Sequence, residues 1–491
     1  MSTRLVKQSS TTWKPHVYQK DGVKFLLKHG AAALFLDPGL GKTSIALAAI
    51  KLLKERNVLN KVLLIAPLRV CHSVWPNEIK KWKDFEGLTY AILHGPDKDE
   101  ELKKDVDIYI INPEGLDWLL DVTKTKDSKG RIKVSVDVKR FKKLGFDTLV
   151  IDELTKFKHI NTARYKSMKL VLNTFSRRWG LTGSPAANGL MDLFGQCYML
   201  DEGRSLGPYI THFRNKYFDQ GYDGFSWTLK PGADDQIFER IKPMSLRINA
   251  DDVLDMPKLI ENNIKVELPP KALKIYLELE KDMISKFEEG KVTAATAAAV
   301  SMKCRQVANG GIYVDQETEA LLSLPSGKKY GAHLHDAKTD ALEDLVNELQ
   351  GNPLLVAYDF NHDLERLQAR FGKDLPYIGG GITAKKSKQL EEAWNAGKLP
   401  ILAGHPQSIA HGLNLQEVGH HICFYAMTWN YELWDQYIRR LRRQGNKSKR
   451  IYVHHLIASG TIDEVILATL KSKASGQNAL FEALKSKYKA K

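Results

Sequence analysis

The chain is poor in cysteine, which excludes two common ways of stabilising a fold. Its 491 residues include only four cysteines, at Cys71, Cys197, Cys304 and Cys423. They lie far apart and form no CxxC pair, so neither a disulfide framework nor a thiolate zinc site is expected. The adjacent histidine pairs at 420–421 and 454–455 have no acids or cysteines at metal-ligand spacing. We therefore expect reduced, buried cysteines and no metal other than magnesium.

Long apolar runs are also missing. No run approaches the roughly 18 to 20 residues that a membrane-spanning helix requires. The first residues, MSTRLVKQSSTTWK, have charges but no apolar signal core behind them. These absences predict a cytoplasmic protein without a membrane partner.

Acidic residues are outnumbered by basic ones. The chain has 73 lysines and arginines against 58 aspartates and glutamates, which gives a formal net charge of +15. This excess suits a polyanionic partner such as nucleic acid, although a solvated basic surface is the plain alternative. The length predicts two or three domains, and 43% hydrophobic residues are enough for ordinary cores.

The most informative stretch is 34–50, with the sequence LFLDPGLGKTSIALAAI. An apolar run at 31–36 indicates a buried strand, a glycine turn follows, and the alanine-rich segment after it has helical spacing. Glycines let backbone N–H groups surround a polyphosphate, and the helix N-terminus adds positive potential. The candidate phosphate-binding residues are Gly39, Gly41, Lys42 and Thr43. Lys42 can reach the terminal phosphates, and the Thr43 hydroxyl can hold magnesium.

A second apolar strand, 146–153, ends in the adjacent carboxylates Asp152 and Glu153. In a parallel sheet this places both acids at the carboxyl edge, where the phosphate loop also lies. One acid can hold magnesium through water while the other polarises the attacking water. Lone Asp-Glu pairs are common, so the preceding strand and the upstream GLGKT give this pair its meaning.

Three other residues of the first half are weaker candidates. Gln19 begins a short amphipathic helix upstream of the phosphate loop, and its amide can read both the donor and the acceptor of an adenine edge. Thr182 and Ser184 follow another strand end and could couple the nucleotide site to a bound partner. A surface glutamine and a tight structural turn are the plain alternatives.

The second half repeats the alternation of strands and helices without a phosphate loop. Near its end, YELWDQYIRRLRRQGNKSK places Gln436, Arg440 and Arg443 at helical spacing, on nearly one face. Four arginines in five positions are costly in a core and excessive for one salt bridge. We interpret them as arginine fingers that complete a nucleotide site across a cleft. A nucleic-acid-binding stripe is the alternative.

The sequence predicts a parallel α/β fold in two halves. The pattern between 201 and 270 is irregular, so we place the boundary between 247 and 270 and assign lobes 1–250 and 251–475 with a basic tail at 476–491. The lysine-rich stretch 124–143 is equally compatible with a hairpin that touches phosphates and with a solvated excursion. The tail is compatible with docking on a lobe or with phosphate contacts.

The order of the motifs resembles that of superfamily-2 helicases, and specifically the Swi/Snf-type DNA translocases. The motifs are YQ at 18–19, GLGKT, IAPLRV followed by Trp75, IDEL, LTGSPAAN, HGLNL at 411–415 and QYIRRLRRQGN. The resemblance runs from about Pro15 to Lys473. It implies two tandem RecA-like domains, each a parallel sheet flanked by helices, with ATP in the cleft between them and DNA across both.

The resemblance also implies residue roles. Gln19 would contact adenine, Lys42 and Thr43 the phosphates and magnesium, and Asp152 and Glu153 the magnesium and the attacking water. Residues implied at the second lobe and in the motifs that link ATP to DNA are Gln436, Arg440, Arg443, Thr182, Ser184, Gly412 and Asn414. The chain departs from the family at Leu154, Thr155, Arg439 and Arg442. These departures bear on how ATP hydrolysis is coupled to DNA, and not on ATP hydrolysis itself.

Together these features predict a compact bacterial or viral ATP-driven translocase on DNA, preferably duplex or branched, with RNA less favoured. A helicase that separates or anneals strands of DNA or RNA would share every motif. A nucleotide-switched DNA clamp with little turnover is a third possibility, against which Glu153 and the arginines argue.

Overall fold

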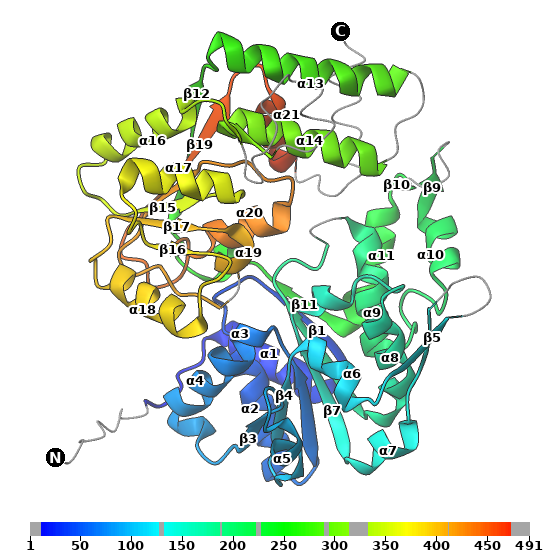
Figure 1. The fold of residues 1–491 in the computed structure, drawn as a ribbon. Helices are drawn as coiled ribbons and strands as arrows, with labels where there is room; N and C mark the ends of the chain where they lie inside the picture. Colours follow the sequence, from blue (N-terminus) through cyan, green and yellow to red (C-terminus); the bar gives the residue numbers. More distant parts are fainter. Residues whose placement is uncertain are drawn as a thin grey trace, which may run out of the picture. The chain divides into compact units, whose positions relative to one another are not determined.

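A computed structural model describes residues 11–126, 132–186, 189–221, 227–288, 294–313, 332–410 and 412–472. The predicted basic tail at 476–491, residues 127–131 of the lysine-rich stretch, and His411 lie outside these described residues. The chain divides into two compact units between Leu254 and Asp255 (Figure 1).

The first unit is built on a seven-stranded parallel sheet. From edge to edge its strands are β11 (Ser245–Ile248), β1 (Ala31–Leu36), β8 (Arg177–Thr182), β7 (Phe146–Asp152), β2 (Lys61–Ile65), β4 (Ile108–Ile111) and β3 (Tyr90–Ile92). Its principal helices are α1 (Val17–Lys28), α2 (Lys42–Glu55), α3 (Leu68–His72), α4 (Val74–Lys81), α5 (Lys98–Lys103), α6 (Leu116–Leu119), α7 (Val138–Lys143), α8 (Ala163–Val171), α9 (Leu193–Asp201), α10 (Ile210–Tyr217), α11 (Ala233–Ile241) and α12 (Ala250–Val253). Helices α1 to α4 lie on one side of β1 and β7, and α6, α8 and α9 lie on the other (Figure 1).

The strand order explains how the first unit gathers its polar residues. Strand β8 lies between β1 and β7, and its register pairs Thr182 with Phe35 of β1 and Leu181 with Asp152 of β7. Because all three strands are parallel, their carboxyl ends meet at one edge of the sheet. Most residues of these three strands are buried, as expected for strands of a parallel sheet that is covered on both faces.

The second unit is built on a six-stranded parallel sheet. Its strand order is β12 (Lys258–Val266), β19 (Arg450–Ala458), β18 (His421–Phe424), β15 (Leu354–Ala357), β17 (Ile401–Gly404) and β16 (Tyr377–Ile378). Its helices include α13 (Pro270–Glu288), α14 (Ala294–Asn309), α16 (Ala337–Glu348), α17 (Asn361–Phe371), α18 (Ala384–Asn395), α19 (Pro406–Ile409), α20 (Tyr431–Ile438) and α21 (Ile462–Lys471). The two parallel sheets flanked by helices confirm the predicted fold class.

Separate cores cover the two faces of the second sheet. In β15, Leu355 and Ala357 belong to one hydrophobic cluster, whereas Leu354 and Val356 belong to another. This alternation follows from the two-residue period of a strand. Both faces of β15 are therefore packed, which accounts for its continuous apolar sequence.

The sequence indicated irregular structure between 201 and 270, and this prediction is wrong in two places. Strand β11 adds an edge to the first sheet, and β12 forms an edge of the second and pairs with β19 along nine residues. Both strands have mixed, half-exposed sequences, because an edge strand is not covered on all sides. Continuous apolar runs, which identify interior strands, are therefore absent from them.

Among the described residues, three antiparallel strand pairs accompany the sheets. They are β5 (Thr123–Lys126) with β6 (Ile132–Ser135), β9 (Phe218–Gln220) with β10 (Trp227–Leu229), and β13 (Gly311–Ile312) with β14 (Ala332–His333). The first pair confirms that the lysine-rich stretch 124–143 contains a hairpin. Strand β5 is exposed throughout, and Lys124 pairs with Asp117. Whether the hairpin touches phosphates stays a prediction.

Two expectations from composition can be compared with the structure. All four cysteines are buried and free of disulfides, as predicted. Burial raises the pKa of the Cys71 thiol to about 12, so this thiol is unreactive near neutral pH. In the described part of the chain, none of the helices combines the length and apolarity needed to cross a bilayer.

Candidate nucleotide-binding site

The phosphate loop connects β1 to α2 as the sequence predicts. Gly39 and Gly41 have positive φ angles of 93° and 78°, a region that residues with a side chain rarely adopt. Gly41 immediately precedes α2, so the helix N-terminus begins at Lys42. A Cβ atom at Gly41 would come within 2.4 Å of the Gln19 Nε2 atom. Both the backbone conformation and the close packing therefore require glycine at this position.

The Lys42 ammonium is held by the loop's own backbone. Its Nζ donates to the carbonyl oxygen of Leu36 at 2.8 Å and to that of Asp37 at 3.4 Å. The Asp37 carboxylate in turn accepts a hydrogen bond from the backbone N–H of Ala250 at 2.9 Å. The side chain is thus folded back over the loop, where a phosphate oxygen could replace the carbonyl groups as its partner.

Gln19 lies in α1 and packs directly on this loop. Its Nε2 donates to the Leu40 carbonyl at 3.1 Å, while its Oε1 accepts from the His16 backbone N–H at 2.9 Å. The side chain is 8% exposed. The structure thus places Gln19 beside the phosphate loop, and its predicted contact with adenine stays a prediction.

Asp152 is the last residue of β7, and both of its carboxylate oxygens accept hydrogen bonds. Oδ2 accepts from the Trp75 indole at 2.8 Å, and Oδ1 accepts from the Glu153 backbone N–H at 3.1 Å. Burial and the neighbouring Glu153 charge raise the pKa of Asp152, while the Trp75 hydrogen bond and the Lys42 charge oppose that rise. Lys42 and Asp152 are therefore close enough to interact electrostatically.

Glu153 adopts a left-handed backbone conformation, with φ of 60°. Such a conformation is uncommon for residues other than glycine and often marks functional sites. Here it ends the strand abruptly, so that Leu154 turns into the core while Glu153 remains half-buried at the sheet edge. Leu154, one of the departures from the family, packs against Gly180 of β8.

Thr182 ends β8 between the strands that lead to Lys42 and Asp152. Its side chain is 1% exposed, and Oγ1 has no hydrogen-bond partner among the described residues. The next residue, Gly183, packs so closely that an added Cβ would lie 2.9 Å from the Pro38 Cδ atom of the phosphate loop. Ser184 follows in the same turn. An unpaired buried hydroxyl at this edge suits a site that a polar ligand completes.

The second unit brings two separate motifs together. Arg440 and Arg443 both donate to the Leu413 carbonyl, at 3.2 Å and 3.4 Å, and Arg443 also donates to the Asn414 side-chain oxygen at 2.6 Å. Gly412, which precedes Leu413 in this loop, has a positive φ of 75°. Arg440 is 6% exposed, whereas Arg443 is half-buried. The predicted arginines therefore contact the predicted coupling loop.

The loop 412–417 is also held from its other side by helix α18. The Glu391 carboxylate accepts from the Asn414 N–H at 2.8 Å, and Asn395 donates to the Asn414 carbonyl at 2.7 Å. The Trp394 indole donates to the Leu415 carbonyl at 2.8 Å. Residues of α18 and the two arginines thus fix the same short segment.

The spacing of Gln436, Arg440 and Arg443 predicted one helix that contains all three, but the helix ends before the arginines. Helix α20 stops at Ile438, and the chain continues in tight turns that place Arg440 and Arg443 beyond it. Gln436 remains on α20, 5% exposed, with an Oε1 atom that has no partner in the described part of the chain. The turns are stabilised by the neighbouring arginines, because Arg439 pairs with Asp435 and Arg442 donates to the Pro257 carbonyl at 2.8 Å.

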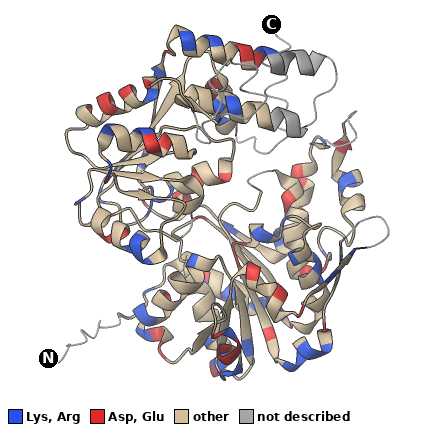
Figure 2. Ribbon diagram, viewed as in Figure 1, with Lys and Arg blue, Asp and Glu red and all other residues tan. Residues whose placement is uncertain are grey.

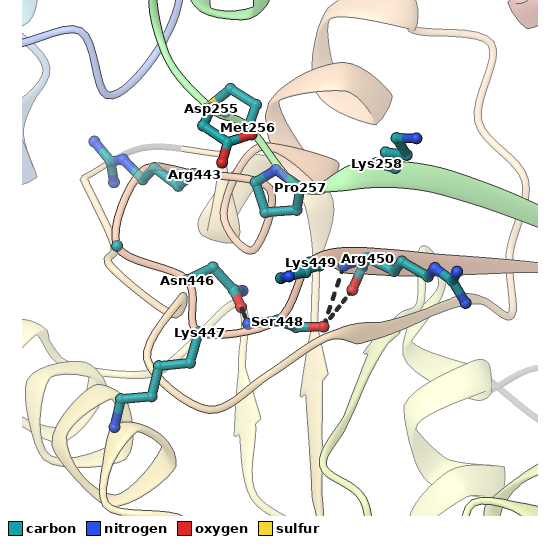
Figure 3. Close-up of a pocket in the computed structure, with 11 residues that line it drawn as sticks. Asp255, Met256, Pro257, Lys258, Arg443, Asn446, Lys447, Ser448, Lys449 and Arg450 are labelled. Carbon is teal, nitrogen blue, oxygen red and sulfur yellow. Dashed lines mark hydrogen bonds between the residues drawn. The ribbon is translucent and has the colours of Figure 1, made fainter.

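A cavity of about 450 Å³ lies in the second unit beside this turn. Residues 255–258, Arg443 and residues 445–450 line it, and they include five basic side chains and one acidic one. In Figure 3 the charged ends of Lys258, Lys447 and Arg450 extend in different directions and do not converge on one point. We therefore assign no anion site to this cavity.

Sequence reasoning missed the contact between Trp75 and Asp152. The tryptophan lies on α4, which follows strand β2, and its side chain is fully buried. The available signal was its place in the helix after a strand of the same sheet, because that position lies at the same carboxyl edge as Asp152.

Comparisons with known proteins identify similar chains. A model of the SNF2-related domain matches residues 18–310. Protein p41 of Acyrthosiphon pisum secondary endosymbiont phage 1 is 32% identical over 97% of this chain and 100% of its own length. YwqA of Bacillus subtilis (strain 168), which carries the name of an ATP-dependent helicase/translocase, is 23% identical over 95% of this chain and 48% of its own length. This chain thus spans about half of YwqA.

One solved structure also aligns with this chain. The Sulfolobus solfataricus SWI2/SNF2 ATPase core in complex with dsDNA is 20% identical, with a TM-score of 0.43, over 94% of this chain and 92% of that structure.

Proposed function

Because this chain belongs to the SNF2-related domain family of ATPases, we propose that it couples ATP hydrolysis to movement along double-stranded DNA. The name of the related YwqA, an ATP-dependent helicase/translocase, supports an activity of this kind. The first unit would bind and hydrolyse ATP, and the second would supply arginines to the same reaction.

One observation carries this proposal. The strand order β1, β8, β7 places the phosphate loop, Thr182 and the acidic pair at the ends of three adjacent strands. The Lys42 charge is near enough to influence the pKa of Asp152. An ATPase needs a phosphate-binding lysine and a metal-binding acid in one site, and the three adjacent strands bring the segments that carry them to the same edge of the sheet.

The residues at this edge fit magnesium, the usual partner of ATP. Asp152 offers a buried carboxylate whose charged form is disfavoured by burial and by Glu153, so a nearby cation would stabilise it. Thr43 offers a hydroxyl at the first turn of α2. Carboxylate and hydroxyl oxygens are suitable magnesium ligands. When bound, Mg²⁺ supplies positive charge that neutralises the phosphate oxygens.

The other residues have roles that follow from their positions. Lys42 would exchange its backbone carbonyl partners for phosphate oxygens. Glu153 would orient and polarise the attacking water, because it is half-buried and adjacent to Asp152. Gln19 would contact adenine, with Gln436 of the second unit as a further nucleotide contact. Arg440 and Arg443 would stabilise the charge that develops during phosphoryl transfer.

DNA is the proposed partner because of charge and family. The net charge of +15 favours a polyanion. Lysines and arginines occur on helices of both units, interspersed with acids, which suits contacts spread along a duplex (Figure 2). Thr182, Ser184, Gly412 and Asn414 would link the nucleotide state to the grip on DNA.

The test is steady-state ATP hydrolysis without nucleic acid and with duplex DNA, branched DNA, single-stranded DNA or RNA. We expect strong stimulation by duplex or branched DNA, and we expect Lys42→Ala to abolish turnover. Movement itself would be measured by displacement of a triplex-forming strand from duplex DNA in the presence of ATP.

Other outcomes would replace the proposal. Stimulation by single strands or RNA alone, with unwinding of a labelled duplex, would indicate a strand-separating helicase. An absence of turnover under all these conditions, with nucleotide-dependent DNA binding, would indicate a clamp.

A further inference from the structure

We propose that helix α4 fixes the geometry of the magnesium site, with Trp75 and Glu78 as positioning residues. The inference rests on the proposed roles of Asp152 and Thr43 as the metal-binding residues. Two hydrogen-bonded connections run from this short helix to the two segments that carry those residues.

The first connection runs from Trp75 to Asp152. The Trp75 side chain is fully buried, and its Nε1 atom lies 2.8 Å from the Asp152 Oδ2 atom. An indole N–H can only donate, so it always presents a hydrogen to this carboxylate oxygen. Because Asp152 Oδ1 accepts from the Glu153 backbone, the carboxylate plane is fixed at both oxygens. The lone pairs that remain are then aimed in a defined direction.

The second connection runs from Glu78 to Ser44, the residue after Thr43. The Ser44 hydroxyl donates to the Glu78 Oε2 atom at 2.8 Å, and the Trp82 indole donates to the same oxygen at 2.6 Å. Ser44 is 6% exposed, and α4 packs against α2. Glu78 therefore anchors the first turn of α2, where the Thr43 hydroxyl lies.

Both connections start from the same face of helix α4. Trp75 and Glu78 are three positions apart in α4, so they project from the same face of the helix. Asp152 ends strand β7, whereas Thr43 lies on α2, the helix that follows β1. Strands β7 and β1 are not adjacent in the sheet. A rigid helix bonded to both segments therefore sets the separation of the carboxylate and the hydroxyl. Neighbours that orient metal ligands in this way commonly change metal affinity by about 10- to 100-fold when removed.

The experiment measures binding of a fluorescent ADP analogue, mant-ADP, by the full chain in the absence of magnesium and over a range of magnesium concentrations. We expect Trp75→Phe and Glu78→Ala each to raise the half-saturating magnesium concentration by about tenfold or more. The affinity for mant-ADP without magnesium should be unchanged. Glu78→Gln should restore most of the magnesium response, because its carbonyl oxygen still accepts from Ser44.

A matched control is Trp118→Phe. The Trp118 indole donates to Asp99 at 3.2 Å, away from the phosphate loop, so its loss should leave the magnesium response unchanged. The proposal is wrong if Trp75→Phe and Glu78→Ala keep the wild-type magnesium response. It is also wrong if they weaken mant-ADP binding equally with and without magnesium, or if Trp118→Phe has the same effect.

If the proposed function itself is wrong, the same experiment would give a different result. In that case the wild-type chain itself would bind no mant-ADP, or would bind it without any gain from magnesium.

Discussion

Arg443 contacts two residues of the loop 412–417. Its guanidinium donates to the Leu413 carbonyl and to the Asn414 side chain. We expect Arg443→Ala to lower DNA-stimulated ATP hydrolysis by about 10³- to 10⁵-fold, by analogy with other arginine fingers. Steady-state phosphate release measures the effect.

The control for this substitution is Lys447→Ala. Lys447 is an exposed cation in the same turn and should be dispensable for hydrolysis. Turnover near the wild-type value in Arg443→Ala would show that another residue supplies the charge.

Buried histidines predict a loss of stability in acid. His455 accepts a hydrogen bond from the Trp434 indole at 3.3 Å and lies 3.2 Å from the Asn263 side-chain oxygen, an arrangement that suits a neutral ring. Burial lowers the pKa of His455 to about 3 and that of His421 to about 4. The unfolded chain takes up these protons near its ordinary pKa of about 6.5, whereas the folded chain does not.

The free energy of unfolding should therefore fall as the pH drops from about 6.5 towards 4. The urea midpoint, measured at pH 7.5 and at pH 5, should decrease. His455→Gln, which retains a donor and an acceptor, should make the decrease shallower. An unchanged midpoint in the wild-type chain would contradict the neutral assignment of these rings.

Among elements, α16 and α21 are joined by a buried ion pair. The Lys338 ammonium lies 2.6 Å from the Asp463 carboxylate and also donates to Asn309 and to the Tyr425 carbonyl. Both charged side chains are at most 1% exposed. Lys338→Met leaves the carboxylate buried without its cation, so we expect a loss of about 3–5 kcal/mol in the free energy of unfolding.

Chemical denaturation would measure this loss. Lys385→Met, on the exposed face of α18, is the control and should have little effect. Adding Asp463→Asn to Lys338→Met should recover part of the stability, because the unpaired charge is then gone. If it recovers none, the loss arises from packing rather than from charge.

Interior elements were predictable from the sequence because burial on both faces produces an apolar run. Strands β1 and β7 lie where such runs indicated them. The phosphate loop was predictable because its glycines have a backbone requirement that few other residues meet. The edge strands β11 and β12 were not, since a half-exposed strand needs no apolar run.

The site was predictable as a set of residues but not as a network of contacts. The acids, lysine and arginines were identified by type and position along the chain. The hydrogen bond between Trp75 and Asp152 joins residues 77 positions apart, and the contact of Arg443 with Asn414 depends on turns beyond the end of α20. Contacts of this kind follow from packing, which a local pattern does not encode.

For the whole molecule, the net charge of +15 predicts salt-sensitive binding to duplex DNA. Each phosphate contact releases counterions, so raising the salt from 50 to 200 mM should weaken binding by about 10³-fold if six or more phosphates are contacted. Fluorescence anisotropy with a labelled duplex would measure the change. Lys42→Ala should show the same salt dependence, because that lysine is assigned to the nucleotide. Affinity that is independent of salt would exclude a charge-based grip.

The position of β19 has a consequence for synthesis on the ribosome. This strand, at 450–458, lies between β12 and β18, so the first and the last described strands of the second unit must pair with each other. Strand β12 emerges almost two hundred residues earlier and, among the described residues, has no strand partner until β19 is made. Chains grow at about 5–20 residues per second, so β12 waits for roughly ten seconds or more with an unpaired edge. During translation this unpaired strand could pair with other chains, so it needs protection from aggregation.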